Sequence, residues 1–212
     1  MKITNESMTL YAITDRHWLD GRSLTDVVED VLKGGATFLQ LREKNLTHEE
    51  LVAEAKKIKK ITDKYNVPFV INDDIYAAKE VDADGVHIGQ KDADYHTARK
   101  LLGPDKIIGM TAPSIELAKK AEAMGADYIG AGAVFGTSTK KDTHPLSTDA
   151  LKAIADSVSI PVVAIGGITT DNINKLKDTD ISGVAVVSAL FASDTPYNAA
   201  RNLYDISKSL FY

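Results

Sequence analysis

Short apolar runs recur along the chain, and they alternate with longer segments in which apolar residues return every three or four positions. The runs have the length and the unbroken apolar character of strands that are buried on both faces. The longer segments have the period of amphipathic helices. Strands are therefore expected at about 10–14, 38–42, 68–71, 84–89, 106–111, 127–132, 161–165 and 183–187.

Residues typical of helix ends support this assignment. Ser23 stands where an N-cap is expected, and Gly34-Gly35 would stop the helix that it opens. Thr47-His48-Glu49-Glu50 has the form of a capping box for a helix predicted over 47–65. Further helices are expected at about 93–102, 114–124 and 147–155, after Thr170, and at about 196–210.

Strands that alternate with helices pair in parallel through right-handed crossovers. Eight such units in just over 200 residues predict a single-domain (β/α)₈ TIM barrel over residues 1–212, with core strands at about 9–188. A doubly wound open sheet is the alternative arrangement. The sequence offers no linker that would separate a second domain.

Composition narrows the range of partners. The net charge of −5 argues against a general nucleic-acid-binding role. The absence of cysteine excludes disulfides, thiolate metal sites and cysteine nucleophiles, and it is compatible with a cytoplasmic protein. The N-terminus lacks a signal-peptide pattern, and no apolar run is long enough to cross a bilayer, so no membrane role is expected. Assembly into a homo-oligomer is compatible with the sequence.

In a TIM barrel the active site lies at the C-terminal ends of the strands, so the polar residues expected there belong together. One group is Gly166-Gly167 with Val187-Ser188. Loops after the seventh and eighth strands commonly bind phosphate through backbone N–H groups, and glycine lets the backbone approach an anion closely. The alternative is that these glycines only form tight turns.

A second group consists of the cations Arg42, Lys44 and Lys140. Positions 40, 42 and 44 share one side of an extended segment, so Gln40, Arg42 and Lys44 should point the same way. Arg and Lys there could hold a second, more highly charged phosphate group. The alternative is that these three cations are ordinary solvated charges with no role in binding.

A third group is a pair of carboxylates, Asp73 and Asp92, at neighbouring strand ends. Mg²⁺ is typically held by one or two carboxylates together with substrate phosphate oxygens. For Asp73 and its neighbour Asp74, the alternative is that they begin the following helix, where acidic residues suit the helix dipole. His87 lies within a strand, where a structural role is favoured over a catalytic one; for Tyr11 and Trp18, packing is favoured over binding a ring.

Two phosphate sites and a metal, with no evident nucleophile or general base, suggest a particular chemistry. The protein would bring together two phosphorylated small molecules and assist the departure of a diphosphate. Mg²⁺ and cationic side chains would stabilise the charge that develops on the leaving group.

The ordered set of motifs resembles the thiamine phosphate synthase family over nearly the whole chain. The residues that carry the resemblance are Gln40-Leu41-Arg42-Glu43-Lys44, Ile71-Asn72-Asp73, Gly85-Val86-His87-Ile88-Gly89-Gln90, Thr137-Ser138-Thr139-Lys140-Lys141-Asp142, Ile165-Gly166-Gly167-Ile168 and Val186-Val187-Ser188. The family joins 4-amino-2-methyl-5-hydroxymethylpyrimidine diphosphate to a thiazole phosphate. Diphosphate leaves, a pyrimidine methylene cation forms, and the thiazole nitrogen captures it.

The resemblance implies a role for each matching residue. The pyrimidine diphosphate would be bound by Gln40, Leu41, Arg42, Glu43, Lys44, Asn72, Thr111 and Lys140, among which Arg42, Lys44, Thr111 and Lys140 would carry catalysis. Asp73 and Asp92 would hold Mg²⁺. The thiazole phosphate would be bound by Thr137, Ser138, Thr139, Gly167, Val187 and Ser188.

The sequence departs from the family pattern at two positions. Thr111 stands where serine is frequent, and Pro113 stands where histidine is common. Two alternatives remain open. One is a metal-independent thiazole tautomerase, or another phosphosugar isomerase on this fold, with His87 as the nearest acid or base. The other is a barrel that binds phosphates without catalysis.

Overall fold

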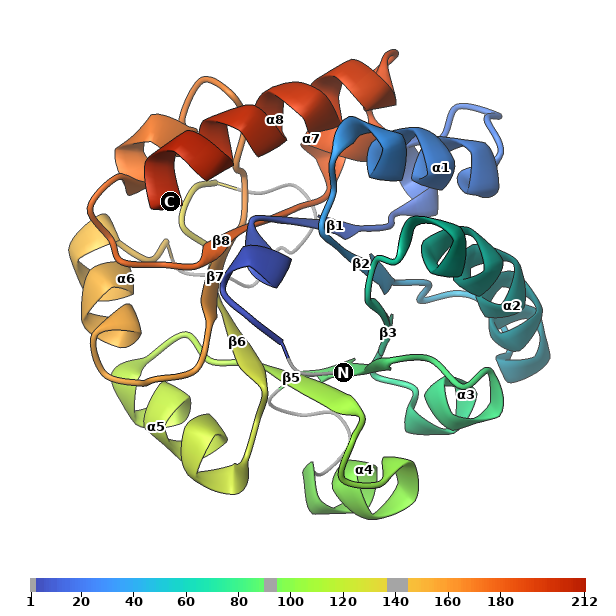
Figure 1. The fold of residues 1–212 in the computed structure, drawn as a ribbon, viewed down its shortest axis with the longest axis horizontal. Helices are drawn as coiled ribbons and strands as arrows, with labels where there is room; N and C mark the ends of the chain where they lie inside the picture. Colours follow the sequence, from blue (N-terminus) through green and yellow to red (C-terminus); the bar gives the residue numbers. More distant parts are fainter. Residues whose placement is uncertain (1–2, 90–94, 137–144) are drawn as a thin grey trace.

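The computed structural model describes residues 3–89, 95–136 and 145–212. Within them, parallel strands close into a barrel in sequence order, surrounded by helices (Figure 1). The strands are β1 (Leu10–Ile13), β2 (Phe38–Leu41), β3 (Phe69–Asn72), β4 (Gly85–Ile88), β5 (Ile107–Thr111), β6 (Tyr128–Gly132), β7 (Val162–Ile165) and β8 (Gly183–Val186). The chain therefore has the predicted TIM-barrel fold. The open-sheet alternative is wrong, because β1 pairs with β8 through Leu10 and Val184 as well as with β2.

The helices follow the strands in turn. They are α1 (Leu24–Gly34), α2 (His48–Tyr65), α3 (Ile75–Glu80), α4 (Tyr95–Leu102), α5 (Ile115–Met124), α6 (Thr148–Ala155), α7 (Ser188–Phe191) and α8 (Pro196–Phe211), with 3₁₀ turns η1 (Glu6–Met8), η2 (Arg16–Trp18) and η3 (Ile173–Leu176). The predicted capping box is present: the Glu50 N–H donates to Thr47 Oγ1, and the Thr47 N–H donates to Glu50 Oε2. Among the described residues, no helix is long and apolar enough to cross a bilayer.

One expectation about the helices is wrong, and one is confirmed only in part. The segment after Thr170 forms only the short turn η3, because Lys177 leaves the helical region and Asp178 and Asp180 adopt positive φ. Ser23 occupies the N-cap position of α1, but its hydroxyl bonds to Thr25 Oγ1 at 2.6 Å and caps no backbone N–H.

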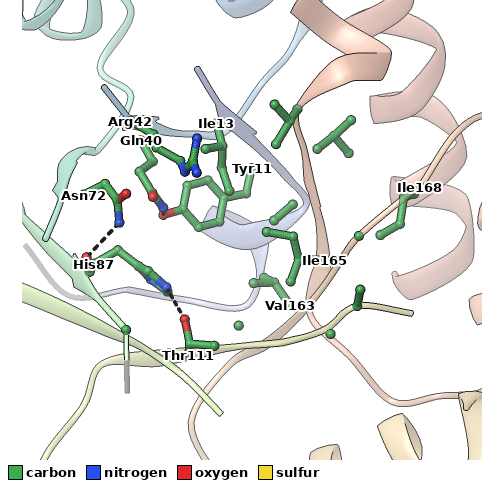
Figure 2. A pocket seen from close by; sticks show the side chains of 18 of the residues that line it. Tyr11, Ile13, Gln40, Arg42, Asn72, His87, Thr111, Val163, Ile165 and Ile168 are labelled. Atoms are coloured by element: carbon green, nitrogen blue, oxygen red, sulfur yellow. Dashed lines mark hydrogen bonds between the residues drawn. The ribbon is translucent and has the colours of Figure 1, made fainter. Parts of the chain in front are cut away.

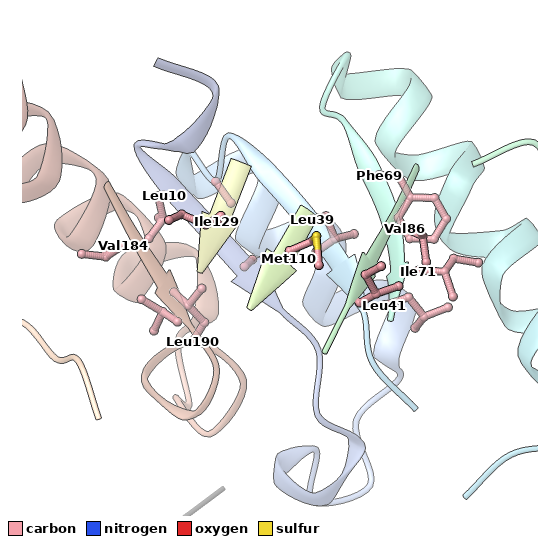
Figure 3. Packing of buried hydrophobic residues seen from close by; sticks show 14 of the residues in the cluster. Leu10, Leu39, Leu41, Phe69, Ile71, Val86, Met110, Ile129, Val184 and Leu190 are labelled. Carbon is pink, nitrogen blue, oxygen red and sulfur yellow. The ribbon is translucent and has the colours of Figure 1, made fainter. Parts of the chain in front are cut away.

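Alternating strand residues face two different layers. Those that point outward, such as Leu39, Ile71 and Val86, pack against the helices and form most of the core (Figure 3). Those that point inward form a smaller cluster that includes Tyr11, Phe38 and Tyr128. Both faces are thus buried, as the unbroken apolar runs predict, and the inward positions nearest the strand ends are left to shape a site.

Candidate active site

A cavity of about 260 Å³ lies within the barrel at the C-terminal ends of the strands (Figure 2). Its lining comes from every part of the barrel wall. The lining residues are Tyr11, Ile13, Gln40, Arg42, Lys44, Asn72, Asp73, His87, Gly89, Thr111, Pro113, Gly130, Gly132, Ala133, Val163, Ile165, Gly166, Gly167, Ile168, Ala185, Val186, Val187 and Ser188.

The cationic side of the cavity follows the predicted alternation along and beyond β2. Gln40, Arg42 and Lys44 line the cavity, whereas Leu41 and Glu43 do not. Leu41 is fully buried in the outer core. Glu43 faces Arg16, with Oε1 3.3 Å from Arg16 Nε, and burial raises the pKa of this carboxyl while Arg16 offsets part of the effect. Leu41 and Glu43, which the family resemblance assigns to the pyrimidine diphosphate, are therefore not among the residues that line the cavity.

Asp73 sits at the end of β3 in a left-handed conformation, with φ of 64°. One carboxylate oxygen, Oδ2, accepts a hydrogen bond from Lys44 Nζ. The other oxygen, Oδ1, is buried and has no hydrogen-bond partner among the described residues. A buried carboxylate oxygen without a partner is costly, so Asp73 presents an unused ligand atom beside the cavity.

Asp74 has a different role from Asp73. Its Oδ1 accepts from the Tyr76 and Ala77 N–H groups at 3.0 and 2.8 Å and so caps α3. Its Oδ2 lies 3.2 Å from His48 Nδ1. The alternative that these two aspartates begin the following helix therefore holds for Asp74, whereas Asp73 lines the cavity.

The floor of the cavity is polar. Tyr11, which packs edge-on against Phe38, also reaches Gln40 and Tyr128 through its hydroxyl. His87 Nδ1 lies 3.0 Å from the Tyr128 hydroxyl, and its Nε2 lies 3.1 Å from Thr111 Oγ1 (Figure 2). Burial raises the pKa of both tyrosines far above its ordinary value, so both hydroxyls stay protonated.

The opposite wall is formed by backbone at the ends of β7 and β8. Gly166 and Gly167 have φ of 109° and 63°, and a Cβ on Gly167 would lie 2.2 Å from the Gly136 carbonyl oxygen. Only glycine fits here. Val187 precedes α7, and neither the Gly167 nor the Ser188 N–H donates to another described residue.

The comparisons with known proteins agree with this architecture. The family model described as thiamine monophosphate synthase matches residues 10–190. The thiamine-phosphate synthase of Clostridium tetani is 49% identical to this chain and covers 94% of it and 95% of its own length. The thiamine-phosphate synthase of Clostridium novyi is 46% identical and covers 93% of this chain and 97% of its own length. The chain belongs to the thiamine-phosphate synthase family. Its function is that of a transferase in thiamine biosynthesis.

A solved structure shows the same fold. The thiamine phosphate pyrophosphorylase of Pyrococcus furiosus superposes with a TM-score of 0.91 at 36% identity, covering 98% of this chain and 99% of that one. The predicted family resemblance is thereby confirmed for sequence and for fold.

Several residues predicted to act in this synthase come together in the cavity, namely Gln40, Arg42, Lys44, Asn72, Asp73, Thr111, Gly167, Val187 and Ser188. Five others, Asp92, Thr137, Ser138, Thr139 and Lys140, lie outside the described residues. The two positions where the sequence departs from the family pattern, Thr111 and Pro113, both line the cavity.

The sequence interpretation missed part of the synthase cavity. Ile13, Val163, Ile165 and Ala185 form an apolar wall, and the only signal that could have found them is their inward position in the strand alternation. It also favoured packing for Tyr11 over a place in the site, although Tyr11 both packs and lines the cavity. Trp18, in contrast, packs against the outer core and is absent from the cavity lining.

The described residues contain no cluster of three or more His, Asp or Glu side chains that could hold a metal by themselves. Asp73 offers one oxygen without a partner and is adjacent to the cationic side of the cavity. That arrangement fits Mg²⁺, which commonly takes only one or two carboxylates and completes its shell with water and substrate phosphate oxygens.

Proposed function

We propose that this synthase performs a Mg²⁺-dependent transfer of the hydroxymethylpyrimidine group from 4-amino-2-methyl-5-hydroxymethylpyrimidine diphosphate to thiazole phosphate. The products are thiamine phosphate and diphosphate. The observation that carries the proposal is the division of one cavity into a cationic side with an unpartnered carboxylate oxygen and a glycine-lined side.

The diphosphate is proposed to bind at the ends of β2 and β3. The Arg42 guanidinium has no ion-pair partner among the described residues, so it is available for two phosphate oxygens. Lys44 is half exposed and can turn from Asp73 to the ligand. Lys140, outside the described residues, is assigned to the same group by the family motif. Asp73 and Asp92 would hold Mg²⁺, which when bound supplies positive charge to the departing diphosphate.

The thiazole phosphate is proposed to bind at the ends of β7 and β8. The N–H groups of Gly167 and Ser188 have no protein partner among the described residues, and the Gly167 backbone is open to close approach. Thr137, Ser138, Thr139 and Val187 are assigned to this phosphate by the family motifs. Anchoring the phosphate here directs the thiazole ring toward the centre of the cavity.

Bond breaking precedes bond making in the proposed path. The methylene carbon–oxygen bond breaks, and its electron pair leaves with the diphosphate. The lone pair of the thiazole nitrogen then forms the new carbon–nitrogen bond. The apolar wall of Ile13, Val163, Ile165 and Ala185 excludes water that would otherwise capture the cation.

The metal-independent tautomerase alternative is less well supported. It requires a general acid or base, and His87 is the nearest one in the cavity. Both ring nitrogens of His87 already engage Tyr128 and Thr111.

Incubation of the protein with both substrates and Mg²⁺ tests the proposal. Thiamine phosphate and diphosphate should appear in equal amounts, only when both substrates are present, and EDTA should stop the reaction. Full turnover in EDTA would refute the metal requirement. Consumption of a thiazole phosphate isomer without the pyrimidine would favour the tautomerase.

A further inference from the structure

A chain of hydrogen bonds crosses the floor of the cavity from β2 to β5. The Gln40 Nε2–H donates to the Tyr11 hydroxyl, which lies 2.7 Å from the Tyr128 hydroxyl. Tyr128 continues to His87 Nδ1 at 3.0 Å, and His87 Nε2 continues to Thr111 Oγ1 at 3.1 Å. Both ends of the chain, Gln40 and Thr111, line the cavity (Figure 2).

Tyr128 links the two halves of this chain without reaching the cavity itself. It is fully buried and absent from the cavity lining. It meets His87 across β5 because Gly109 pairs in register with both His87 and Tyr128 and has no side chain between them. A Cβ on Gly109 would lie 2.1 Å from Tyr128 Cζ. The position of the Tyr128 hydroxyl is therefore fixed by the sheet.

The hydrogen bonds in this chain all run in one direction, with each group donating to the next from Gln40 to Thr111. An amide nitrogen can only donate, so the Tyr11 oxygen accepts from Gln40. Tyr11 is buried and its hydroxyl bonds to no other described group, so its single hydrogen goes to Tyr128. Tyr128 in turn gives its hydrogen to His87 Nδ1. The His87 ring must then carry its proton on Nε2 and donate it to Thr111.

This direction decides what the two ends offer to a ligand. Gln40 uses its amide nitrogen within the chain, and no described residue donates to its Oε1, which is left as an acceptor. Thr111 accepts from His87, so its own hydroxyl hydrogen is not used in that contact and can be donated to a ligand. An acceptor and a donor match the edge of a 4-aminopyrimidine, which carries an amino donor beside a ring-nitrogen acceptor. A 4-oxopyrimidine presents the reverse pattern.

We propose that Tyr128 is a positioning residue that fixes the direction of this chain and thereby makes the cavity select an amino-substituted over an oxo-substituted pyrimidine. The inference rests on the proposed pyrimidine diphosphate site, and it adds to that site a determinant that touches no substrate atom. A site with a fixed hydrogen-bond pattern discriminates strongly, because the wrong partner leaves buried polar groups unpaired.

The tautomer of His87 gives a test that needs no substrate. Nitrogen-15 NMR of histidine-labelled protein, with the His87 signals assigned by their loss in His87→Gln, should show the proton on Nε2 and none on Nδ1. In Tyr128→Phe the donor to Nδ1 is gone, so this fixed tautomer should be lost. A proton on Nδ1 of His87 in the unsubstituted protein would overturn the inference.

Binding selectivity gives the second test. We expect the ratio of dissociation constants for the 4-oxo analogue and the 4-amino pyrimidine diphosphate, measured by calorimetry without thiazole phosphate, to fall by about tenfold or more in Tyr128→Phe. Tyr11→Phe cuts the same chain and should act alike, which covers the case that Tyr128→Phe does not fold. The matched control is Tyr95→Phe, which removes a tyrosine hydroxyl bonded to the Gly125 carbonyl outside the cavity and should leave the ratio unchanged.

The outcomes separate this inference from the proposed reaction. An unchanged ratio in both chain-cutting variants refutes the role of Tyr128, even in a protein that makes thiamine phosphate normally. Failure of the unsubstituted protein to make thiamine phosphate from both substrates and Mg²⁺ would refute the proposed reaction instead. The His87 tautomer would still report the direction of the chain in that case.

Discussion

Replacing Asp73 with asparagine isolates the proposed metal-binding role of this residue. Asparagine is nearly isosteric with aspartate and tolerates the left-handed conformation that position 73 adopts. The change removes one negative charge, which ends the ion pair with Lys44, and it replaces one of the two carboxylate oxygens with an amide nitrogen. The backbone and the cap of α3 should stay intact, because Asp74 provides the cap.

The structure sets the expected cost in stability. The sequence alone suggests that neutralising Asp73 would relieve its repulsion with Asp74. The ion pair with Lys44 changes this expectation to a small loss. Because Lys44 is half exposed, the pair should contribute less than about 1 kcal/mol. We therefore expect the melting temperature of Asp73→Asn without Mg²⁺ to fall by no more than about 4 °C.

The expected cost in rate is much larger. Loss of one preorganised electrostatic contact to a developing charge commonly lowers the rate by about 10²–10³. Asp73→Asn should show such a loss in thiamine phosphate synthesis at ordinary Mg²⁺, with partial recovery at high Mg²⁺. The affinity for thiazole phosphate, proposed to bind at the ends of β7 and β8, should change little.

Asp74→Asn is the matched control for this prediction. It removes the same charge one residue away, and asparagine is an equally good N-cap. Its activity should stay close to that of the unsubstituted protein, since Asp74 does not line the cavity. Equal losses in the two variants, or full activity of Asp73→Asn in EDTA, would refute the metal assignment.

Three further predictions concern other parts of the chain. Arg42→Lys keeps the charge but loses the planar fork, so kcat/KM for the pyrimidine diphosphate should fall about 10–100-fold at an unchanged melting temperature; unaltered kinetics would place Arg42 outside the site. In Gly167→Ala the new Cβ would meet the Gly136 carbonyl, so the free energy of unfolding, measured by denaturant titration, should fall by about 1 kcal/mol or more. The KM for thiazole phosphate, measured by steady-state kinetics, should rise. Hydrogen bonds to Asp74 and, as the second cause, to Glu80 raise the pKa of His48. The protonated ring therefore stabilises the fold fully below its ordinary pKa near 6.5, and this stabilisation is lost as the pH rises through the raised pKa. His48→Gln should flatten the pH dependence of the melting temperature over this pH range.

The barrel and one side of its site follow from local sequence pattern. Unbroken apolar runs such as the one ending at Ile71 predict parallel strands buried on both faces, and the structure buries both faces. Period-two alternation predicts that Gln40, Arg42 and Lys44 share a side, and all three line the cavity. These predictions succeed because each depends on residues close together in the chain.

Other features depend on contacts between distant residues and could not be predicted in this way. The sequence cannot tell that Lys44 turns back to Asp73, since that contact depends on the path of the loop after β2. The meeting of Tyr128 with His87 depends on the strand register and on Gly109 between them. The missing helix after Thr170 reflects a local competition: Asn172 bonds to the Thr169 N–H and the Gly167 carbonyl, which favours a turn.

The order of strands explains how two phosphorylated substrates could meet in one small cavity. The cationic side belongs to β2 and β3 and the glycine-lined side to β7 and β8, and in the closed barrel β1 lies between β8 and β2. The proposed phosphate sites are therefore separated by a single strand, whose inward residues Tyr11 and Ile13 line the cavity. Ile13 supplies apolar surface between the two proposed phosphate sites, while Tyr11 joins the polar floor below. A reactive carbon released beside β2 would thus face the thiazole ring across an apolar surface, which favours capture by nitrogen over capture by water.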